Sequence, residues 1–345
     1  MSELIRRQRL RALAVMAGLA GVLVAAGLGL AVFERPAAVA TERMGQPVIA
    51  LDRGLKEVER IDVALADESY SLVRTDEDWR MDTSTGFPVR PDRARALLVG
   101  LRELSWGEAR TRDPRKFDTL GLGDPRKGGS GALVTLKNRS GEALARLIAG
   151  RRDERLYARR PDEPAAWRVE GELPPLHGRD TWMDFAVLSM QPETIGAVLI
   201  APAAGEQLLL VREPGEGPRA FEPGPAHPDE RLVSPLAAST PALALSRFAP
   251  IDVKPAAELQ TAPVARHVTI THDGLEVEAK AYREPDGRYV TLRAIEAGEG
   301  AARAEAINRR AAGWAFELTR YDWAEYTPSI AAIVERAIVP QPAGE

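Results

Sequence analysis

The sequence predicts an α+β protein: a single N-terminal transmembrane helix followed by a tandem pair of hairpin-rich β-sheet units, each with one or two packed helices. Three observations predict this class. An uncharged run near the N-terminus is long enough to cross a bilayer. Short stretches of alternating apolar and polar residues follow, separated by turn sequences and interrupted by stretches of helical period. This order of elements occurs twice, which indicates a duplication. The predicted segments are a cytoplasmic basic N-terminus over 1–11, the transmembrane helix over 12–33, a tether over 34–56, a first unit over 57–190 and a second unit over 191–340.

The composition is typical of a folded two-domain protein that does not bind nucleic acid. At 345 residues, 45% of them hydrophobic and 28% charged, the chain is long enough to bury two cores. It has no cysteine, which excludes disulfides, thiolate metal ligands and a cysteine nucleophile. The net charge is −4, and the arginines near the N-terminus leave the rest of the chain more acidic still. Such a body lacks the basic surface that neutralises phosphates, so we expect no nucleic-acid partner.

Residues 12–33 are expected to anchor the chain in a membrane. These 22 residues carry no charge, and as a helix they would span about 33 Å, enough for a bilayer core of about 30 Å. Basic residues precede the run, so the positive-inside rule keeps the N-terminus in the cytoplasm and places the C-terminal body on the other side of the membrane. Small residues spaced four apart within the run also favour self-association through this helix. The residues that determine the topology are Arg6, Arg7, Arg9 and Arg11.

A cleaved signal peptide is the alternative to an anchor. Ala38-Val39-Ala40 has the small residues of a cleavage site. The apolar run is longer than the ~7–15 residues of a signal core, however, and Glu34 and Arg35 separate it from that site. We therefore expect an anchor, with cleavage after Ala40 as the open alternative.

In the first unit, the period of the apolar residues changes from two to that of a helix and back again. Residues 61–65 and 70–73 alternate as strands do. Residues 91–104 place their apolar side chains on one helical face, with Pro91 and Asp92 in the first turn. Strands return on both sides of the turn sequences "NRSG" and "PDEP". The first unit is therefore expected to hold a helix among hairpins.

The second unit repeats this order with a more interrupted helix. Pro235 and Pro241 break the helical pattern of residues 229–248. Three strands over 264–295 are joined by "HDG" and "EPDG", which are strong hairpin signals. The remaining elements are expected to be a strand pair over 195–211, a helix over 301–310 that ends by Gly313, a strand over 314–321 and a terminal helix that begins at Thr327-Pro328.

No motif in the sequence specifies a catalytic site, a metal site or a cofactor. The segment "GDPRKGGS" (123–130) is close to a phosphate-binding loop, but Lys127 stands inside the spacer and the segment lies between a helix and a strand. His267 and His272 are five apart on a predicted strand, so they face opposite sides and do not share a metal. The acidic stretches 67–69 and 76–78 fall in predicted turns, where such residues are common. We therefore predict a non-enzyme with no cofactor and no bound metal.

Aromatic residues near two chain turns are the candidates for contact with a partner. Most of the tryptophans alternate with apolar neighbours, which is typical of core packing. Trp182 in "DTWMDF" and Trp323 in "YDWAEY", together with Tyr326, stand in more polar surroundings. We expect these three side chains to contribute to a partner surface.

Several strings together resemble one family. They are "GFPVRPDRARALLVGL", "FDTLGLGDP" before "VTLKNRSGEAL", "YARRP…WRVEG", "LSRFAPIDVKPAAEL", "HDGLEVEAKAYRE" and "EAINRRAAGWAFELTRYDWAEY". In these strings, which run from about Val58 to Val334, the chain is similar to the bacterial DUF4340 family, a domain of unknown function. The most specific parts are "LGLGDP" and the run from Asn308 to Leu318. The resemblance implies a single-pass envelope protein of the bacterial inner membrane, with its C-terminal body in the periplasm beside gliding-motility-type ABC transporters. It brings no catalytic residues with it.

These observations support one leading hypothesis and two alternatives. The leading one is a non-catalytic, membrane-anchored periplasmic accessory or scaffold protein that works with the permease or auxiliary subunits of an ABC-type export system. The first alternative is a periplasmic binding module for cell-envelope polymer or lipid. The second is an envelope hydrolase, which would need carboxylates that converge in one cleft.

Overall fold

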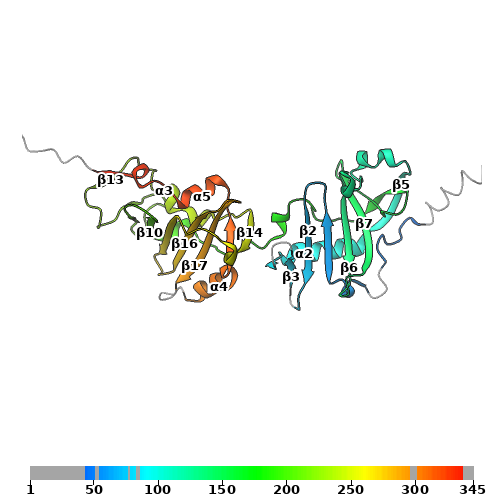
Figure 1. Ribbon diagram of the computed structural model, residues 1–345, viewed down its shortest axis with the longest axis horizontal. Coiled ribbons are helices and arrows are strands. Elements are labelled where there is room, and N and C mark those ends of the chain that lie inside the picture. The colour runs from blue at the N-terminus through cyan, green and yellow to red at the C-terminus, as the bar shows by residue number, and fades with distance from the viewer. Residues whose placement is uncertain (1–42, 51–53, 77, 83–85, 296–300, 337–345) are drawn as a thin grey trace, which may run out of the picture. The chain divides into compact units, whose positions relative to one another are not determined.

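Figure 1 shows the computed structural model of the chain, which describes residues 43–50, 54–76, 78–82, 86–295 and 301–336. These residues form two compact units. Unit 1 comprises the described residues up to 76 together with 91–179, and unit 2 comprises 78–90 and the described residues from 180 onward. The predicted transmembrane segment 12–33, with Arg6, Arg7, Arg9 and Arg11, and the cleavage site at Ala40 lie outside the described residues. Within the described part, no helix is both long and apolar enough to cross a membrane.

Unit 1 is built on one antiparallel sheet, in the strand order β2-β1-β6-β7-β8-β9-β5. Alternation along each strand places every second side chain in the core, and Ile61 and Val63 of β1 are almost completely buried. Ile61 stands opposite Leu72 on one side and Leu136 on the other. The strands are β1 (Arg60–Ala64), β2 (Ser69–Arg74), β5 (Ser105–Thr111), β6 (Ala132–Lys137), β7 (Ala143–Arg152), β8 (Arg155–Arg159) and β9 (Ala166–Glu170).

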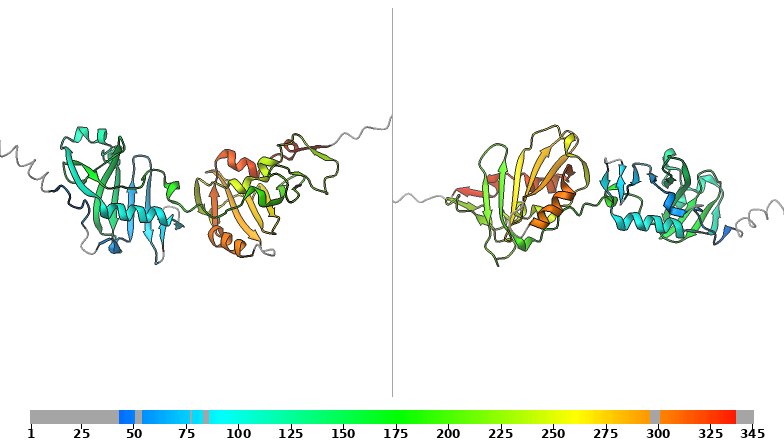
Figure 2. Two further views of the ribbon diagram at one scale, coloured as in Figure 1. Left: turned by 180° about the vertical axis from the view of Figure 1, so that it is seen from behind. Right: turned by 90° about the horizontal axis from the view of Figure 1, so that it is seen from below.

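The helix α2 (Pro91–Glu103) lies along one face of this sheet (Figure 2). Pro91 suits the first turn, where its missing N–H leaves no hydrogen bond unmade, and Asp92 complements the positive helix end. Leu97 and Leu101 recur at helical spacing and are fully buried. The predicted helix over 91–104 is therefore confirmed.

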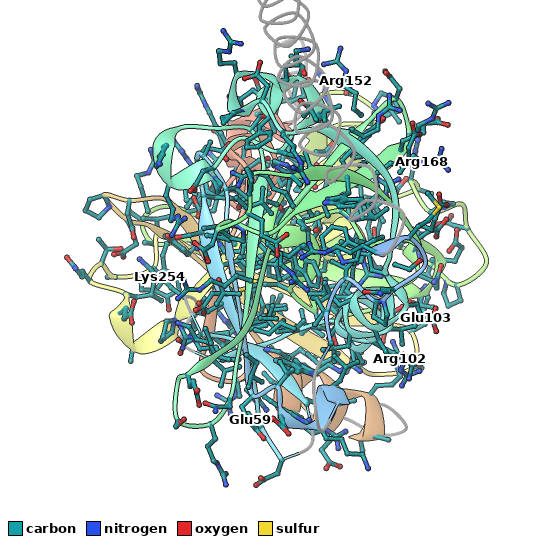
Figure 3. All side chains as sticks on the ribbon, turned by 90° about the vertical axis from the view of Figure 1, so that its right-hand side faces the viewer. Glu59, Arg102, Glu103, Arg152, Arg168 and Lys254 are labelled. Carbon is teal, nitrogen blue, oxygen red and sulfur yellow. The ribbon has the colours of Figure 1, made fainter. Side chains whose placement is uncertain are left out.

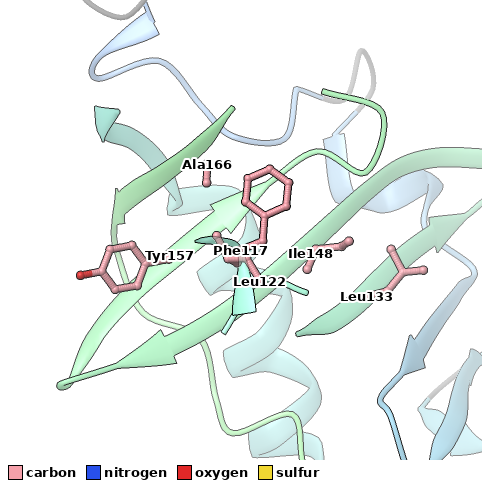
Figure 4. Close-up of a cluster of buried hydrophobic side chains, with 6 residues drawn as sticks. All are labelled: Phe117, Leu122, Leu133, Ile148, Tyr157 and Ala166. Atoms are coloured by element: carbon pink, nitrogen blue, oxygen red, sulfur yellow. The ribbon is translucent and has the colours of Figure 1, made fainter. Parts of the chain in front are cut away.

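A loop over 112–131 covers part of the sheet and is held there by a cluster of buried apolar side chains. Figure 4 shows two residues of this loop, Phe117 and Leu122, among side chains that project from the strands. Leu133 of β6 and Ile148 of β7 stand opposite each other in the ladder and belong to this cluster. The loop is therefore packed on the sheet by burial of apolar area, which fixes its position against β7.

Unit 2 is built on a second antiparallel sheet, in the order β12-β11-β10-β15-β16-β17-β18-β14. α4 (Ala301–Ala311) packs against β17, and α5 (Arg320–Tyr326) packs against β15, β16 and β17. The short helix α3 (Ser239–Ala242) lies between strands β13 and β14 in the chain. The strands are β10 (Ile195–Pro202), β11 (Leu208–Val211), β12 (Glu222–Pro223), β14 (Asp252–Pro255), β15 (Ala265–Thr271), β16 (Glu276–Arg283), β17 (Arg288–Ile295) and β18 (Trp314–Glu317), with a separate pair β13 (Glu230–Leu232) and β19 (Val334–Arg336).

Residues 78–90 also belong to unit 2. They form the hairpin β3 (Trp79–Met81) and β4 (Phe87–Pro88). The Phe87 ring is 1% exposed and makes edge-to-face contacts with Trp314 at 5.1 Å and Phe316 at 6.0 Å. Through these contacts the hairpin packs on β18 of unit 2.

The sheets of the two units share one strand order. When strands are ranked by their position along the chain, the same rank stands at each place in the two sheets. The orders compared are β2-β1-β6-β7-β8-β9-β5 in unit 1 and β11-β10-β15-β16-β17-β18-β14 in unit 2. In both units the strand that closes one edge, β5 or β14, precedes the long meander in sequence and pairs with its last strand. This common order is consistent with the duplication that the sequence predicts.

The prediction of an α+β class is wrong. The described chain is mostly β-structure in three antiparallel sheets, and its helices run from 4 to 13 residues. The expected terminal helix from Thr327-Pro328 is one source of this error. α5 ends at Tyr326, and after a single 3-10 turn at Ile330–Ala332 the chain pairs as β19 with β13. This pairing joins residues about a hundred positions apart, and long-range partners of this kind override local helical propensity.

Candidate functional site

Unit 1 contains a pocket of about 450 Å³ beside the end of β7. Its walls are mostly apolar, and polar groups gather where the sheet, the 112–131 loop and the segment after β9 meet. The apolar wall residues are Ala132, Ala149, Leu156, Leu173, Pro174, Pro175 and Leu176. The polar residues are Asp118, Ser130, Arg151, Arg152 and His177. An apolar concavity with a few converging polar groups is the usual form of a small-molecule site.

Glycines bring the loop close to the sheet at this pocket. A Cβ atom on Gly150 of β7 would stand 1.9 Å from the carbonyl oxygen of Gly121, so the two backbones touch where no side chain fits. Gly121 itself has a φ of +68°, which glycine adopts without strain. A Cβ on Gly123 would stand 1.8 Å from Asp118 Oδ1. The glycines of "LGLGDP" therefore serve close backbone packing.

A buried arginine fastens the same loop to β8. Arg159 is 5% exposed, and its Nε donates to the carbonyl oxygen of Leu122 at 2.9 Å. Its guanidinium lies 4.5 Å from the centre of the Phe117 ring. Burial lowers the pKa of Arg159, and the nearby Asp124 carboxylate opposes that shift. Arg159 thus serves to position the loop.

The segment 173–179, which forms the opposite wall, is held by hydrogen bonds. Tyr70 Oη donates to the Leu176 carbonyl oxygen at 2.7 Å. The Glu68 carboxylate accepts from the backbone N–H groups of Gly178, at 2.7 Å, and Arg179. Glu68 belongs to one of the acidic stretches noted in the sequence, and here it fixes a loop.

Two adjacent arginines give the rim of the pocket a positive charge. Arg151 Nη2 donates to the Leu173 carbonyl oxygen at 3.2 Å, and Arg152 Nη1 donates to the Thr119 carbonyl oxygen at 3.2 Å. Figure 3 shows Arg152 at the outside of the molecule. Asp118, which also lines the pocket, accepts from Ser130 N and Oγ at 3.0 and 3.2 Å. The rim therefore holds two guanidinium groups against one carboxylate, which is already hydrogen-bonded.

The phosphate-loop-like segment 123–130 belongs to this region but has no phosphate-loop geometry. It forms a 3-10 turn at Pro125–Lys127 that Asp124 caps by accepting from Arg126 N. The Arg126 guanidinium also pairs with Asp124 at 2.7 Å, and Lys127 is exposed. The segment is therefore a short turn that Asp124 caps, as the sequence predicts for a loop between a helix and a strand.

Unit 2 presents a second candidate, a pair of arginines on one tryptophan. Arg283 of β16 and Arg288 of β17 stand directly opposite each other in the ladder. Their guanidinium carbons lie 4.9 and 6.0 Å from the centre of the Trp323 ring on α5. Among the described residues, neither guanidinium has a hydrogen-bond or ion-pair partner. Directly opposed like charges destabilise a sheet, so this arrangement favours an anion from outside. We call Arg283, Arg288 and Trp323 the arginine–tryptophan site.

The three aromatic residues proposed for partner contact are not on the surface, and that expectation is corrected. Trp182 is 0% exposed, Trp323 4% and Tyr326 2%. Tyr326 Oη donates to the Ala244 carbonyl oxygen at 3.1 Å, so it packs inside unit 2. Only Trp323 reaches the candidate site, as the platform beneath the two arginines.

Tyr321 is the exposed aromatic residue of α5, at 84%, and no sequence pattern predicts this exposure. On a helix, Trp323 and Tyr326 share one face because they are three apart, whereas Tyr321 points elsewhere. The sequence predicts a strand over 314–321, but β18 ends at Glu317 and α5 begins at Arg320, so Tyr321 belongs to the helix. The Thr319 side chain accepts from Asp322 N and caps this helix.

The sequence predicts His267 and His272 on one strand, but β15 ends at Thr271, so His267 lies on the strand and His272 in the turn that follows it. His267 is 1% exposed, and its ring bonds through Nε2 to the Pro241 carbonyl oxygen at 2.8 Å, whereas His272 is exposed. Burial lowers the pKa of His267 to about 4, so its ring is neutral at pH 7. No group of three or more His, Asp or Glu side chains in the described part of the chain is placed to hold a metal ion.

The family motif that begins at Asn308 also has a structural role. The side-chain amide of Asn308 on α4 donates to the Ala294 carbonyl oxygen and accepts from Ala294 N, both at 2.8 Å. Ala294 lies beyond the part of β17 that pairs with β18. Ala294 stands opposite Val277 of β16, so the amide satisfies its backbone groups on the other side, where β18 does not reach.

Comparison with known proteins identifies one family. A family model described as "Domain of unknown function (DUF4340)" matches residues 79–262, more than half of the chain. The match includes the pocket loop and ends before Asn308. No curated protein matches the chain, and no solved structure matches it. On the extent of the family match, the chain belongs to the DUF4340 family.

Proposed function

We propose that this protein is a membrane-anchored accessory or scaffold protein of the bacterial envelope, whose two units stand in the periplasm beside the permease or auxiliary subunits of an ABC-type export system. It acts by binding, without catalysis. The uncharged run over 12–33 and the arginines before it support the location. The resemblance to envelope proteins beside gliding-motility-type transporters supports the partner.

The single observation that carries a binding role is the arginine–tryptophan site. Arg283 and Arg288 are held together by the β16–β17 register, and Trp323 orders both guanidinium groups before any partner arrives. A carboxylate that bridges them would replace repulsion by charge-assisted hydrogen bonds, which are about twice as strong as neutral ones. The partner is therefore expected to offer an acidic segment to this site.

Co-purification from detergent tests this proposal. The unchanged chain should recover a transporter permease or auxiliary subunit, and the double charge reversal Arg283→Glu/Arg288→Glu should lose it. The matched control is Arg219→Glu/Arg309→Glu, which changes the net charge equally at two exposed arginines of unit 2. The proposal fails if the unchanged chain recovers no transporter component, or if both double variants bind equally.

Location is tested separately. A reporter enzyme that works only in the periplasm, fused to the C-terminus, should be active in intact cells. The mature protein should keep residues 12–33 and sediment with membranes. Mature chains that begin near Thr41, or a silent reporter, would contradict the anchored topology.

A second candidate function is a binding module for envelope polymer or lipid. The pocket of unit 1 favours it, because an apolar concavity with a charged rim suits a ligand better than it suits a scaffold surface.

A further inference from the structure

We propose that the pocket of unit 1 binds a single-chain lipid with an anionic headgroup, of the lysophospholipid class. The apolar wall would cover the acyl chain, and Arg151 and Arg152 at the rim would bind the phosphate. This inference does not depend on the exporter partnership, because every residue involved lies within unit 1.

The wall supplies the apolar half of this recognition. Ala149 of β7 and Leu156 of β8 come from the sheet, and Leu173 and Leu176 come from the segment after β9. No charged side chain stands among these wall residues, so contact with an acyl chain removes apolar area from water on both sides. The volume of about 450 Å³ lies low in the usual range of about 300–1,000 Å³ for ligand pockets, which suits one chain.

The rim supplies the anionic half. Arg151 and Arg152 are exposed, and each bonds a backbone carbonyl oxygen with one nitrogen, which leaves its remaining donors for a ligand. Among the described residues, the one ion pair of these two guanidinium groups joins Arg152 Nε to Asp153 at 3.9 Å, and the Asp153 side chain is 88% exposed. Such an exposed pair stabilises little, so it competes weakly with a phosphate. A planar guanidinium group can donate two parallel hydrogen bonds to two oxygens of one phosphate.

The pocket is formed before a ligand arrives. The Gly121–Gly150 contact fixes the loop on one side. Tyr70 and Arg151 hold the carbonyl groups of Leu176 and Leu173 on the other. Binding therefore orders little additional chain, and this preorganisation favours affinity.

The test uses the full-length chain in amphipol, free of added lipid, and titrates it with lysophosphatidylglycerol and with zwitterionic lysophosphatidylcholine of equal chain length. The anionic lipid should bind about tenfold more tightly or better. Arg151→Gln/Arg152→Gln should remove this preference, so that the anionic and the zwitterionic lipid bind with equal affinity. The matched control is Arg155→Gln, an exposed arginine opposite Arg152 in the same hairpin and outside the pocket.

A diazirine on the acyl chain then locates the bound lipid. Adducts should map to residues 149–156 and 173–176. The proposal is overturned if the unchanged chain binds both lipids equally, if Arg155→Gln loses as much as the double variant, or if the adducts lie elsewhere. Equal binding of dodecanoate and the lysophospholipid would also overturn it, because it would assign the site to free fatty acids.

Discussion

Gly150 of β7 and Gly121 of the covering loop pack backbone against backbone, so closely that a Cβ atom on Gly150 would stand 1.9 Å from the Gly121 carbonyl oxygen. The obstructing atom is backbone, which cannot rotate away as the end of a side chain can. This contact requires glycine at position 150 and holds the "LGLGDP" loop against β7, which fixes one wall of the pocket.

Gly150→Ala should therefore destabilise unit 1. Relief of the clash requires the loop to move from the sheet, and overpacking of this kind costs about 1–3 kcal/mol. Urea unfolding followed by circular dichroism measures the loss. Gly217→Ala is the control, because a Cβ there meets nothing within 4 Å. Equal stability of the two variants would show that the loop can move away from β7 without a loss of stability.

Unit 2 should lose stability in acid through His267. Burial lowers its folded-state pKa to about 4, against an ordinary value of 6.5, so the folded protein keeps the ring neutral where the unfolded chain protonates it. The stabilisation is complete above pH 6.5 and is lost as the pH falls through about 4. Its full size is about 3 kcal/mol.

Urea midpoints between pH 7.5 and pH 4.5 check this sign. His267→Gln should flatten the dependence, whereas His272→Gln, at an exposed position in the turn after β15, should leave it unchanged. A dependence that survives His267→Gln would assign the acid sensitivity to other groups.

Arg212 should be needed for the fold of unit 2. It is 5% exposed, and its Nη2 donates to the carbonyl oxygens of Pro192 and Glu193, both at 2.9 Å, and to that of Ile195. Arg212→Met leaves these acceptors without their donor, which costs about 1–3 kcal/mol. Thermal unfolding should show the loss, and Arg219→Met, at an exposed arginine, should not.

Asn308 should protect the backbone of Ala294. Asn308→Ala removes both hydrogen bonds to that residue, so the Ala294 amide should exchange with solvent at least tenfold faster, and unfolding should cost about 2 kcal/mol less. Hydrogen exchange measured residue by residue gives the answer. Arg309→Ala, at the exposed neighbour, is the control; unchanged exchange at Ala294 in the Asn308 variant would show that β17 is protected by other means.

Local chemistry made the hairpins predictable. "HDG" and "EPDG" separate β15, β16 and β17 as the sequence predicts, because Gly274 at φ +87° closes its turn whatever packs around it. The helix at 91–104 was equally readable from its own spacing. Elements that depend on distant partners were not: β19 exists because β13 pairs with it.

The candidate sites were hidden for the same reason. Arg283 and Arg288 become neighbours only when the register of β16 and β17 is known. The three aromatic side chains stand among charges in the sequence and inside the core in the fold, because their polar neighbours face the other way. The pocket joins residues from 118 to 177, which no local pattern connects.

Photocrosslinking in intact membranes from position 283 reports which proteins the arginine–tryptophan site contacts in the cell. If this site binds a transporter subunit, position 283 should give an adduct with a permease or auxiliary subunit of an ABC-type exporter, and the exposed position 309 should give none. No adduct from position 283, or the same adducts from both positions, would contradict such binding.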